Sequence, residues 1–451
     1  YKRQSVDIEL HNEEGQIHTF SGTTNDGFLR YEILARETTQ DGTLWMINNL
    51  YTVDVSVSLD GENTGKIHQF YGISNYDKGS ATTTSTSTTW EEQVTSTVEI
   101  NPATTNGPTL ILGDNFGASV VDIGDLNSDG VNDLAVGAHG DDMDESGNIA
   151  GGTNRGAVHI FYMNTDGSVD STVEINDSTA NGPTLANGDF FGESVANIGD
   201  LNSDGVNDLA VSSAASVVYK RQAVHIMFMN TDGSVDSTVE INDSTANGPT
   251  LRNSDKFGIS VANIGDLNGD GVNDLAVGAE SDDMDESGNA AGGTNRGAVH
   301  IMFMNTDGSV DSTVEINSST ANGPTLADSD WFGRSVANIG DLDGDGVNDL
   351  AVGATGDNMD ANGDDDGGAN RGAIHIIHMN TDGSVKSVVE INDFTTNGPA
   401  PSNQDFLGRS VANIGDLDGN GINDLAVGAS GDDGGDGIGN NSGAVHIIFL
   451  E

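Results

Sequence analysis

The sequence predicts an all-β fold: a β-propeller of four-stranded blades, five copies of which are present, after a small N-terminal β-rich segment. Three observations predict it. Glycine accounts for 61 of 451 residues, about twice the usual ~7%, while Pro numbers only 7, which favours tight turns. The phrase Ile-Gly-Asp-Leu recurs at intervals of 75, 66, 75 and 75 residues, with its Asp at Asp125, Asp200, Asp266, Asp341 and Asp416. Each period holds four strand-like runs and no 3.6-residue periodicity, as expected of a blade.

The first part of the chain does not match the repeat. Within residues 1–78, alternating segments such as 53–59 indicate strands of an incomplete β-sandwich domain. Residues 79–93 are rich in Ser and Thr as far as Thr89 and are interpreted as a solvated linker. The sequence therefore predicts three parts: a β-rich segment at 1–78, a linker at 79–93 and the propeller at 94–451.

The second copy illustrates the strands expected in one blade. Residues 194–198 alternate, 208–211 are a short apolar run, 223–229 are a longer one and 237–241 alternate again. Asp232-Gly233 between the last two is a hairpin signal. These four runs therefore predict the four antiparallel strands of one blade.

The two ends of the repeat region each carry part of a blade. Residues 444–450 are a third strand without a fourth, and residues 96–100 are a fourth strand without the preceding three. Joining them would close a ring of five blades and remove the open sheet edges. The alternative, left open, is that the chain belongs to a larger ring.

A basic tetrapeptide occurs twice in this acidic chain. Residues 1–4 and 219–222 are both Tyr-Lys-Arg-Gln, and Val218 precedes the second copy. The string resembles the translated end of a transposase sequencing adapter. We interpret residues near 212–222 as an assembly scar, which accounts for the interval of 66, and expect a truncated N-terminus.

Composition excludes several classes of protein. The chain has 71 Asp and Glu against 16 Lys and Arg, a formal charge of −55. Such a charge repels nucleic acid and anionic lipid. Zero Cys excludes disulfides, thiolate zinc sites and Cys nucleophiles. No run approaches the ~18 apolar residues of a membrane helix, and no secretory signal is visible, so no membrane insertion is expected.

Each repeat contains one motif that carries chemistry, Asp-x-Asn/Asp-x-Asp/Asn-Gly-x-x-Asp. Oxygen ligands at positions 1, 3, 5 and 9, a main-chain carbonyl at position 7 and Gly at position 6 suit Ca²⁺. The predicted ligands are Asp125, Asn127, Asp129, Asp133; Asp200, Asn202, Asp204, Asp208; Asp266, Asn268, Asp270, Asp274; Asp341, Asp343, Asp345, Asp349; and Asp416, Asp418, Asn420, Asp424, with the carbonyls of Val131, Val206, Val272, Val347 and Ile422. Up to five Ca²⁺ are expected.

This calcium site has two alternatives. An EF-hand needs an acidic residue at position 12 and a following helix, whereas position 12 is Val136 in a strand-like run. The Asp residues could also serve only as Asx-turns. The fourth loop, with four carboxylates, is expected to bind Ca²⁺ most tightly.

The repeats resemble FG-GAP repeats of the integrin α-subunit propeller and its bacterial and archaeal relatives. The Phe-Gly element begins at Phe116, Phe191, Phe257 and Phe332 and becomes Leu407-Gly408 in the fifth copy. The Gly-Ala-Pro element begins at Gly156, Gly297, Gly372 and Gly443 but lacks its Pro, and the second copy has Gln222-Ala223. The resemblance covers residues 94–451 approximately and is specific for fold. For function it is weak, because such propellers serve adhesion, enzyme and scaffold proteins alike.

The resemblance implies that the calcium loops lie on one face and the connections between second and third strands on the opposite, ligand-binding face. Those connections are acidic: Asp141, Asp142, Asp144, Glu145; Asp282, Asp283, Asp285, Glu286; Asp357, Asp360, Asp364, Asp365, Asp366; Asp432, Asp433 and Asp436. They predict either a cation-bridged surface for a partner or a solvated loop. The repeated His159, His225, His300, His375 and His446 are interpreted as packing or surface residues.

The function expected is that of an extracellular or cell-surface calcium-binding propeller that mediates adhesion or binds a protein or surface glycan. Ionisable clusters are copied in repeat after repeat, whereas a catalytic site needs a few groups in unlike environments, so no enzyme activity is expected. Two alternatives remain: a non-catalytic module of a polysaccharide-acting enzyme, and a passive surface scaffold.

Overall fold

The computed structural model describes residues 97–451 except 143–152, 215–221, 284–293, 359–368 and 433–441, and, before residue 97, only strands. The chain forms two compact units, Tyr1–Ser96 and Thr97–Glu451. The linker predicted at 79–93, most of the suspected scar and most of the acidic connections therefore lie outside the described residues.

The first unit contains a four-stranded antiparallel sheet in the order β2-β1-β5-β6. Its strands are β1 (Gln4–His11), β2 (Ile17–Thr24), β5 (Tyr51–Leu59) and β6 (Glu62–Tyr71), and a short pair is formed by β3 (Glu37–Thr38) and β4 (Leu44–Trp45). The alternating run at 53–59 lies in β5. The assignment of this unit as part of a sandwich remains a prediction.

The second unit consists of five antiparallel sheets built from the five repeats. The strands are β7 (Phe116–Gly124), β8 (Asp133–Ala138), β9 (Ala157–Met163), β10 (Val169–Ile175); β11 (Phe191–Gly199), β12 (Asp208–Ala214), β13 (Gln222–Met229), β14 (Val235–Ile241); β15 (Phe257–Gly265), β16 (Asp274–Ala279), β17 (Ala298–Met304), β18 (Val310–Ile316); β19 (Phe332–Gly340), β20 (Asp349–Ala354), β21 (Ala373–Met379), β22 (Val385–Ile391); and β23 (Leu407–Gly415), β24 (Asp424–Ala429), β25 (Ala444–Ile448).

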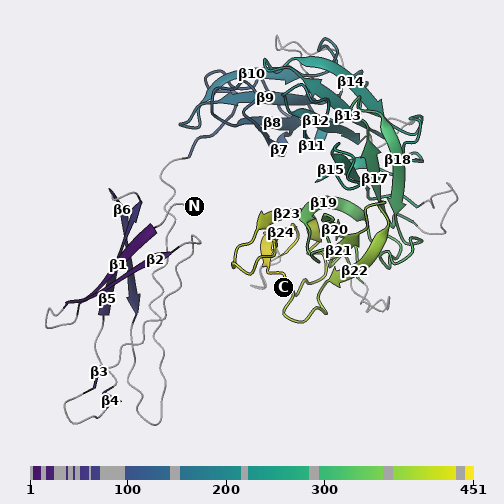
Figure 1. Cartoon of the computed structure of the whole chain (residues 1–451). Coiled ribbons are helices and arrows are strands. Elements are labelled where there is room, and N and C mark those ends of the chain that lie inside the picture. Colours follow the sequence, from purple (N-terminus) through teal and green to yellow (C-terminus); the bar gives the residue numbers. More distant parts are fainter. Residues whose placement is uncertain are drawn as a thin grey trace. The chain divides into compact units, whose positions relative to one another are not determined.

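The sheets follow one another as the blades of a β-propeller, with the first strand of each blade on the inner side and, in the first four blades, the fourth on the outer side (Figure 1). Within a blade each strand pairs with the next in sequence, as in β11-β12-β13-β14. The all-β propeller predicted from the repeat is confirmed. The strands expected at 194–198, 208–211, 223–229 and 237–241 are all present.

The hydrophobic core lies between neighbouring blades. One cluster joins Ile226 and Phe228 of the second blade to Leu275 and Val277 of the third. The period-2 alternation of each strand presents one set of side chains to the preceding blade and the other to the following blade, so internal blades are buried on both faces. Each internal blade therefore depends on two neighbours.

The repeated Gly of the third-strand element allows the main chains of adjacent blades to touch. Gly156, Gly297 and Gly372 form parallel bridges to the first residue of the next blade. A Cβ at Gly297, which has φ +89°, would lie 2.0 Å from the Phe332 carbonyl oxygen. In the second copy Gln222 replaces this Gly, and its Oε1 accepts a hydrogen bond from the Phe257 N–H at 2.6 Å. In the second blade, a side-chain amide thus makes the contact to the next blade that the main chain of a glycine makes in the first, third and fourth blades.

The two end blades each have one exposed face. Val120 in β7 is 60% exposed, whereas its counterpart Val261 is 8% exposed. The prediction of a fourth strand at 96–100 is wrong, because residues 97–100 form no strand and the last sheet has three strands. This segment instead leads to Asn106, whose side chain donates to the Asp170 carbonyl of the first blade at 2.6 Å. A strand needs a sheet edge to pair with, and here the chain runs along the outside of β10.

Candidate metal loops of the blades

The five predicted metal loops connect the first and second strands of the five blades, as β7 and β8 show for the first loop. Gly130 at position 6 has φ +93°, a left-handed conformation that glycine adopts without steric cost. All twenty predicted side-chain ligands lie among the described residues. The loop is therefore a tight strand-to-strand turn, as its sequence predicts.

Within each loop the side-chain oxygens bend inward to main-chain N–H groups. Asp125 accepts from Asp129 N at 2.9 Å and from Gly130 N at 2.8 Å. Asn127 accepts from Asp129 N at 2.9 Å, and Asp129 from Val131 N at 2.8 Å. These are the hydrogen bonds of Asx-turns. The alternative role of the Asp residues as Asx-turns therefore accounts for part of the motif. A carboxylate oxygen has more than one lone pair and can still bind a cation.

The Asp at position 9 is fully buried in every copy. Asp133 accepts from Leu126 N and Met163 N, both at 3.0 Å, and so ties the loop to the end of the third strand. Burial raises the pKa of Asp208 and of Asp274 to about 6, although their main-chain hydrogen bonds lower it. The buried carboxylate anchors the loop whether or not a cation is bound.

The donor set of these loops fits a hard divalent cation. Oxygens of Asp341, Asp343 and Asp345 lie within 4.8 Å of one another, as do those of Asp416, Asp418 and Asp424. A Ca²⁺ with bonds of about 2.3–2.6 Å can connect oxygens separated by up to about 5 Å. The other predicted side-chain ligands lie in the equivalent turns of their own blades. The assignment of the position-7 carbonyls as ligands remains a prediction.

One repeated Asn at the metal loops was missed by the sequence reasoning. Asn207 Nδ2 donates to the Ile123 carbonyl of the preceding blade at 2.9 Å. The same bond, also at 2.9 Å, is made by Asn273, Asn348 and Asn423. The sequence contains a signal for this residue, because an Asn directly precedes the position-9 Asp in every copy. We call these four residues the latch asparagines, since each fastens a metal loop to the neighbouring blade.

The fourth loop has two additional neighbours. Lys386 Nζ lies 2.6 Å from Asp343 Oδ2 and 2.6 Å from Asp345 Oδ2. These two hydrogen bonds raise the pKa of Lys386 above its usual value. His378 Nδ1 lies 3.1 Å from Asp349 Oδ2 and 3.8 Å from Asp343 Oδ2.

The repeated His residues of the first four blades are packing residues, one of the two roles predicted for them. His159, His225, His300 and His375 are 1–3% exposed, and the ring of His375 meets that of Phe332 edge to face at 5.4 Å. His159 Nε2 lies 3.4 Å from Asp141 Oδ2. Burial lowers the pKa of His225, whose partner is Ser213 Oγ at 3.1 Å, to about 4.

The first carboxylate of the acidic connection is not a surface group in the first, third and fourth blades. Asp141, Asp282 and Asp357 are 2% exposed and face the buried His residues. The main-chain N–H of Arg155 donates to the second carboxylate, Asp142, at 3.3 Å. These members of the connections belong to the interior of the blade, so only the carboxylates farther along remain candidates for the cation-bridged surface.

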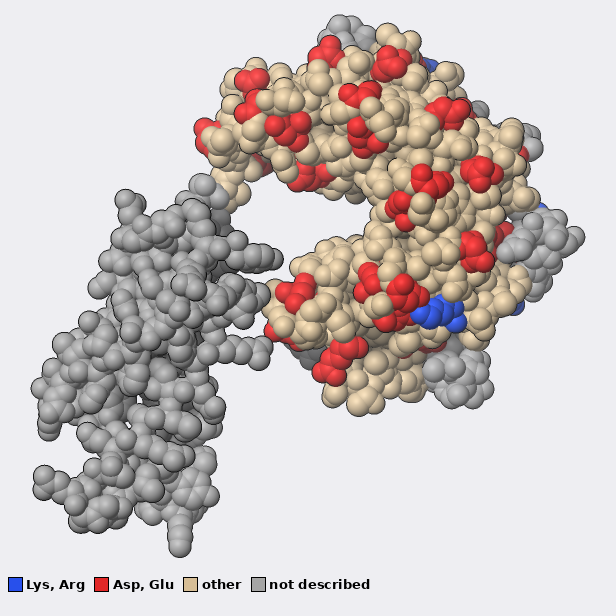
Figure 2. Space-filling view, in the orientation of Figure 1, with Lys and Arg blue, Asp and Glu red and all other residues tan. Residues whose placement is uncertain are grey.

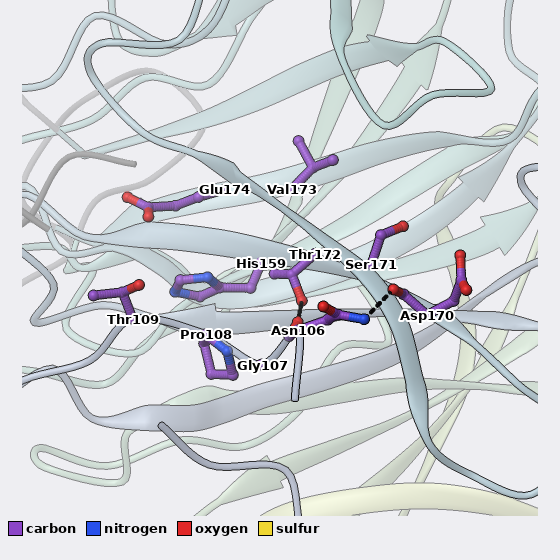
Figure 3. Close-up of a pocket in the computed structure, with 10 residues that line it drawn as sticks. All are labelled: Asn106, Gly107, Pro108, Thr109, His159, Asp170, Ser171, Thr172, Val173 and Glu174. Atoms are coloured by element: carbon purple, nitrogen blue, oxygen red, sulfur yellow. Dashed lines mark hydrogen bonds between the residues drawn. The ribbon is translucent and has the colours of Figure 1, made fainter. Parts of the chain in front are cut away.

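A cavity of about 530 Å³ lies at the outer edge of the first blade and recurs in the third blade with about 440 Å³. In Figure 3 the His159 ring points toward the same end of it as Thr109 and the Glu174 carboxylate. Thr172 Oγ1 donates to the Asn106 carbonyl at 2.6 Å across it. Because Thr313 makes the equivalent bond to Asn247, the cavity recurs where the segment that leads into a blade crosses the fourth strand of that blade.

The exposed surface of the repeat unit is acidic. Figure 2 shows Asp and Glu distributed over the blades in view, with few Lys or Arg among them. Within the described part of the chain, no helix is long and apolar enough to cross a membrane.

The fold and its loops define a β-propeller with one acidic loop per blade. The FG-GAP repeat model matches residues 117–161, 257–302 and 332–377. The chain is 33% identical over 172 residues to integrin alpha-PS5 of Drosophila melanogaster, covering 38% of this chain and 15% of that protein. It is 32% identical over 253 residues to integrin alpha-5 of Xenopus laevis, covering 53% of this chain and 20% of that protein. It is thus an integrin-alpha-like FG-GAP repeat protein that spans a fifth or less of these relatives' length.

Proposed function

We propose that this chain is an extracellular calcium-binding propeller that mediates adhesion or binds a partner at a cell surface. The observation that carries the proposal is the loop geometry, in which oxygens of Asp341, Asp343 and Asp345 converge within 4.8 Å at the position given by the repeat. Similarity to integrin alpha chains supports a role in ligand binding. No enzymatic reaction is proposed.

Calcium would act on the junctions between blades as well as on the loops. Each latch asparagine is adjacent in sequence to a buried position-9 ligand and bonded to the preceding blade, as Asn273 is beside Asp274. A cation that fixes the loop therefore also fixes the latch. We infer that calcium holds the blades in one arrangement and so shapes the partner-binding face.

The first test is thermal unfolding in 10 mM CaCl₂ and in chelator. Ligands that bind only the folded state add RT ln(1 + [L]/Kd) per site, about 1.4–2.7 kcal/mol here if Kd lies at roughly 10⁻⁴–10⁻³ M. We expect a clear rise in melting temperature with calcium. The Asp270→Asn variant keeps the Asx-turn acceptor but loses a charged ligand, so its rise should be smaller. Identical melts with and without calcium would leave the Asx-turn as the only role of the motif.

The second test addresses the partner. Binding of the calcium-loaded protein to a glycan array and to cells measures whether a protein or surface glycan is recognised. Binding to a polysaccharide alone would favour a module of a polysaccharide-acting enzyme. Failure to bind any glycan or cell surface would favour a passive scaffold, whatever the calcium melts show.

A further inference from the structure

The fourth metal loop differs from the others in the residue that the third strand places beside it. In β17, Phe303 pairs with Ser312, and in β13, Phe228 pairs with Ser237. The same register position in β21 is His378, which pairs with Ser387. An aromatic ring is expected at this position, but only His brings a nitrogen that can bind a metal. The fourth loop is therefore the one described loop with a nitrogen donor at this register position.

The nitrogen is close enough to two predicted ligands to share an ion with them. Nδ1 of His378 and one oxygen each of Asp343 and Asp349 lie within 4.8 Å of one another. The two measured nitrogen-to-oxygen separations are 3.1 and 3.8 Å. Zinc bonds to imidazole nitrogen and carboxylate oxygen are about 2.0–2.2 Å, and a tetrahedral arrangement of such bonds separates neighbouring ligands by about 3.3–3.6 Å. The measured separations bracket that range.

The site is partly open, as a metal centre with an exchangeable ligand must be. The side chain of Asp349 is 1% exposed, that of His378 is 14% and that of Asp343 is 23%. Asp349 is held by two main-chain N–H groups, because its Oδ2 accepts from Leu342 N at 2.9 Å and its Oδ1 from Met379 N at 3.0 Å. Solvent reaches the site from the Asp343 side, where a water molecule can complete the coordination.

Charge does not distinguish this loop from the others, because Lys386 offsets the extra carboxylate. Four Asp side chains and one Lys give a formal charge of −3, as do the three Asp side chains of the third loop. The expectation that the fourth loop binds Ca²⁺ most tightly rested on its four carboxylates and is weakened by this lysine. What remains distinctive is the imidazole.

We propose that Asp343, Asp349 and His378 form a mixed carboxylate and imidazole site that selects a borderline divalent transition ion, with Zn²⁺ as the test ion. Imidazole suits zinc and similar ions, whereas calcium prefers oxygen ligands throughout. This proposal rests on the proposed function only in placing a cation at the loop. Lys386 would hold Asp343 and Asp345 in position, and Zn²⁺ competes with it for Asp343.

The test is a Zn²⁺ titration by calorimetry in excess Ca²⁺, which saturates the oxygen-only loops. The matched variant is His378→Phe, because Phe stands at this position in the second and third blades and should fold. We expect it to bind Zn²⁺ at least about 10-fold more weakly at one site, while keeping its calcium-dependent melting temperature. Lys386→Ala should bind Zn²⁺ more tightly. Zn²⁺ binding that is unchanged in both variants overturns the proposal and assigns an adventitious ion only.

A second readout separates the metal site from a structural hydrogen bond between His378 and Asp349. The imidazole NMR signals of His378 should shift when one equivalent of Zn²⁺ is added. His378 signals that stay unchanged would also overturn the proposal. If zinc binding depends on His378 but the melting temperature does not change with calcium, the zinc site is retained and the proposed calcium function is rejected. A calcium-dependent melt without zinc binding would do the reverse.

Discussion

Asp255 and Asp330 are carboxylic acids buried beside a second carboxylate. Asp255 is 5% exposed, and burial, followed by the charges of Asp282 and Asp283, raises its pKa to about 8, against the opposing effect of its bond from Arg252 N. Burial, followed by the Asp357 charge, likewise raises the pKa of Asp330 to about 8. Both groups are therefore neutral in the folded protein at mildly acidic pH, unlike an ordinary Asp.

This burial predicts a loss of stability as the pH rises. A carboxyl group whose pKa is raised on folding favours the folded state most below its unfolded pKa of about 4, and loses that contribution as pH rises toward 8. We expect Asp255→Asn to be more stable than the parent at pH 8 by at least about 1.4 kcal/mol, the equivalent of one pKa unit. Urea unfolding at pH 4, 6 and 8 measures this.

The control for this prediction is Asp236→Asn, which removes one negative charge at an exposed position of β14. Its stability should follow the parent at every pH. A parallel pH dependence for Asp255→Asn and the parent would show that Asp255 is not the source of the loss.

At the residue scale, the sequence predicted the groups whose role is local. The twenty side chains predicted as loop ligands could each be assigned to one turn, because a turn of nine residues brings its own side chains together. The buried Asp255 could not be placed, since its pKa depends on Asp282, which only the folded blade brings close. For the same reason Lys386, on the fourth strand, could not be assigned to a loop between the first and second strands.

At the scale of the element, the third strand is preceded by a glycine that the next blade requires. Gly297 has φ +89°, and a Cβ added to it would lie 2.0 Å from the Phe332 oxygen, whereas Gly188 has φ +77° and open space around it. Both substitutions to Ala incur a left-handed backbone cost of about 1–2 kcal/mol. Gly297→Ala should incur a further ~1–3 kcal/mol from the clash. Equal losses of unfolding free energy in the two variants would contradict the proposed close approach.

The latch asparagines give a second prediction at this scale. Asn348 donates to the Ile264 carbonyl of the preceding blade at 2.9 Å, whereas Asn132 of the first copy donates to Asp122 of its own blade at 2.8 Å. Asn348→Ala leaves a main-chain carbonyl without its partner, so we expect a loss of about 1–3 kcal/mol. Asn132→Ala, whose acceptor is exposed, should cost less. Chemical denaturation of the two variants measures the difference.

The strands of an internal blade could be predicted because their alternation is complete and repeated. The predicted run at 208–211 became β12, which continues to Ala214. The prediction for 96–100 was wrong although its sequence is identical to that of 171–175 at the end of β10. A fourth strand forms only on the edge of a third strand, and the sequence pattern does not say which edge is within reach.

At the scale of the whole molecule, the blades form a linear series in which each contacts its neighbours. Stability in such a series is approximately a sum of terms for each blade and each junction. The internal blades have two junctions and the end blades one. The exposed faces of the first and last blades should therefore contribute least to the cooperative core.

Ile301 and Ile447 occupy the same register position in the third strands of an internal and an end blade, and are 0% and 45% exposed. Removing a buried Ile side chain costs about 2–5 kcal/mol because a cavity is left, whereas a half-exposed side chain loses little. We expect Ile301→Ala to lower the unfolding free energy by about 3 kcal/mol and Ile447→Ala by less than about 1 kcal/mol. Hydrogen exchange of the parent protein should agree, with β17 protected longer than β25 because opening an internal blade disrupts two junctions. Equal losses in the two variants, together with equal protection of the two strands, would show that the last blade is covered on both faces in solution.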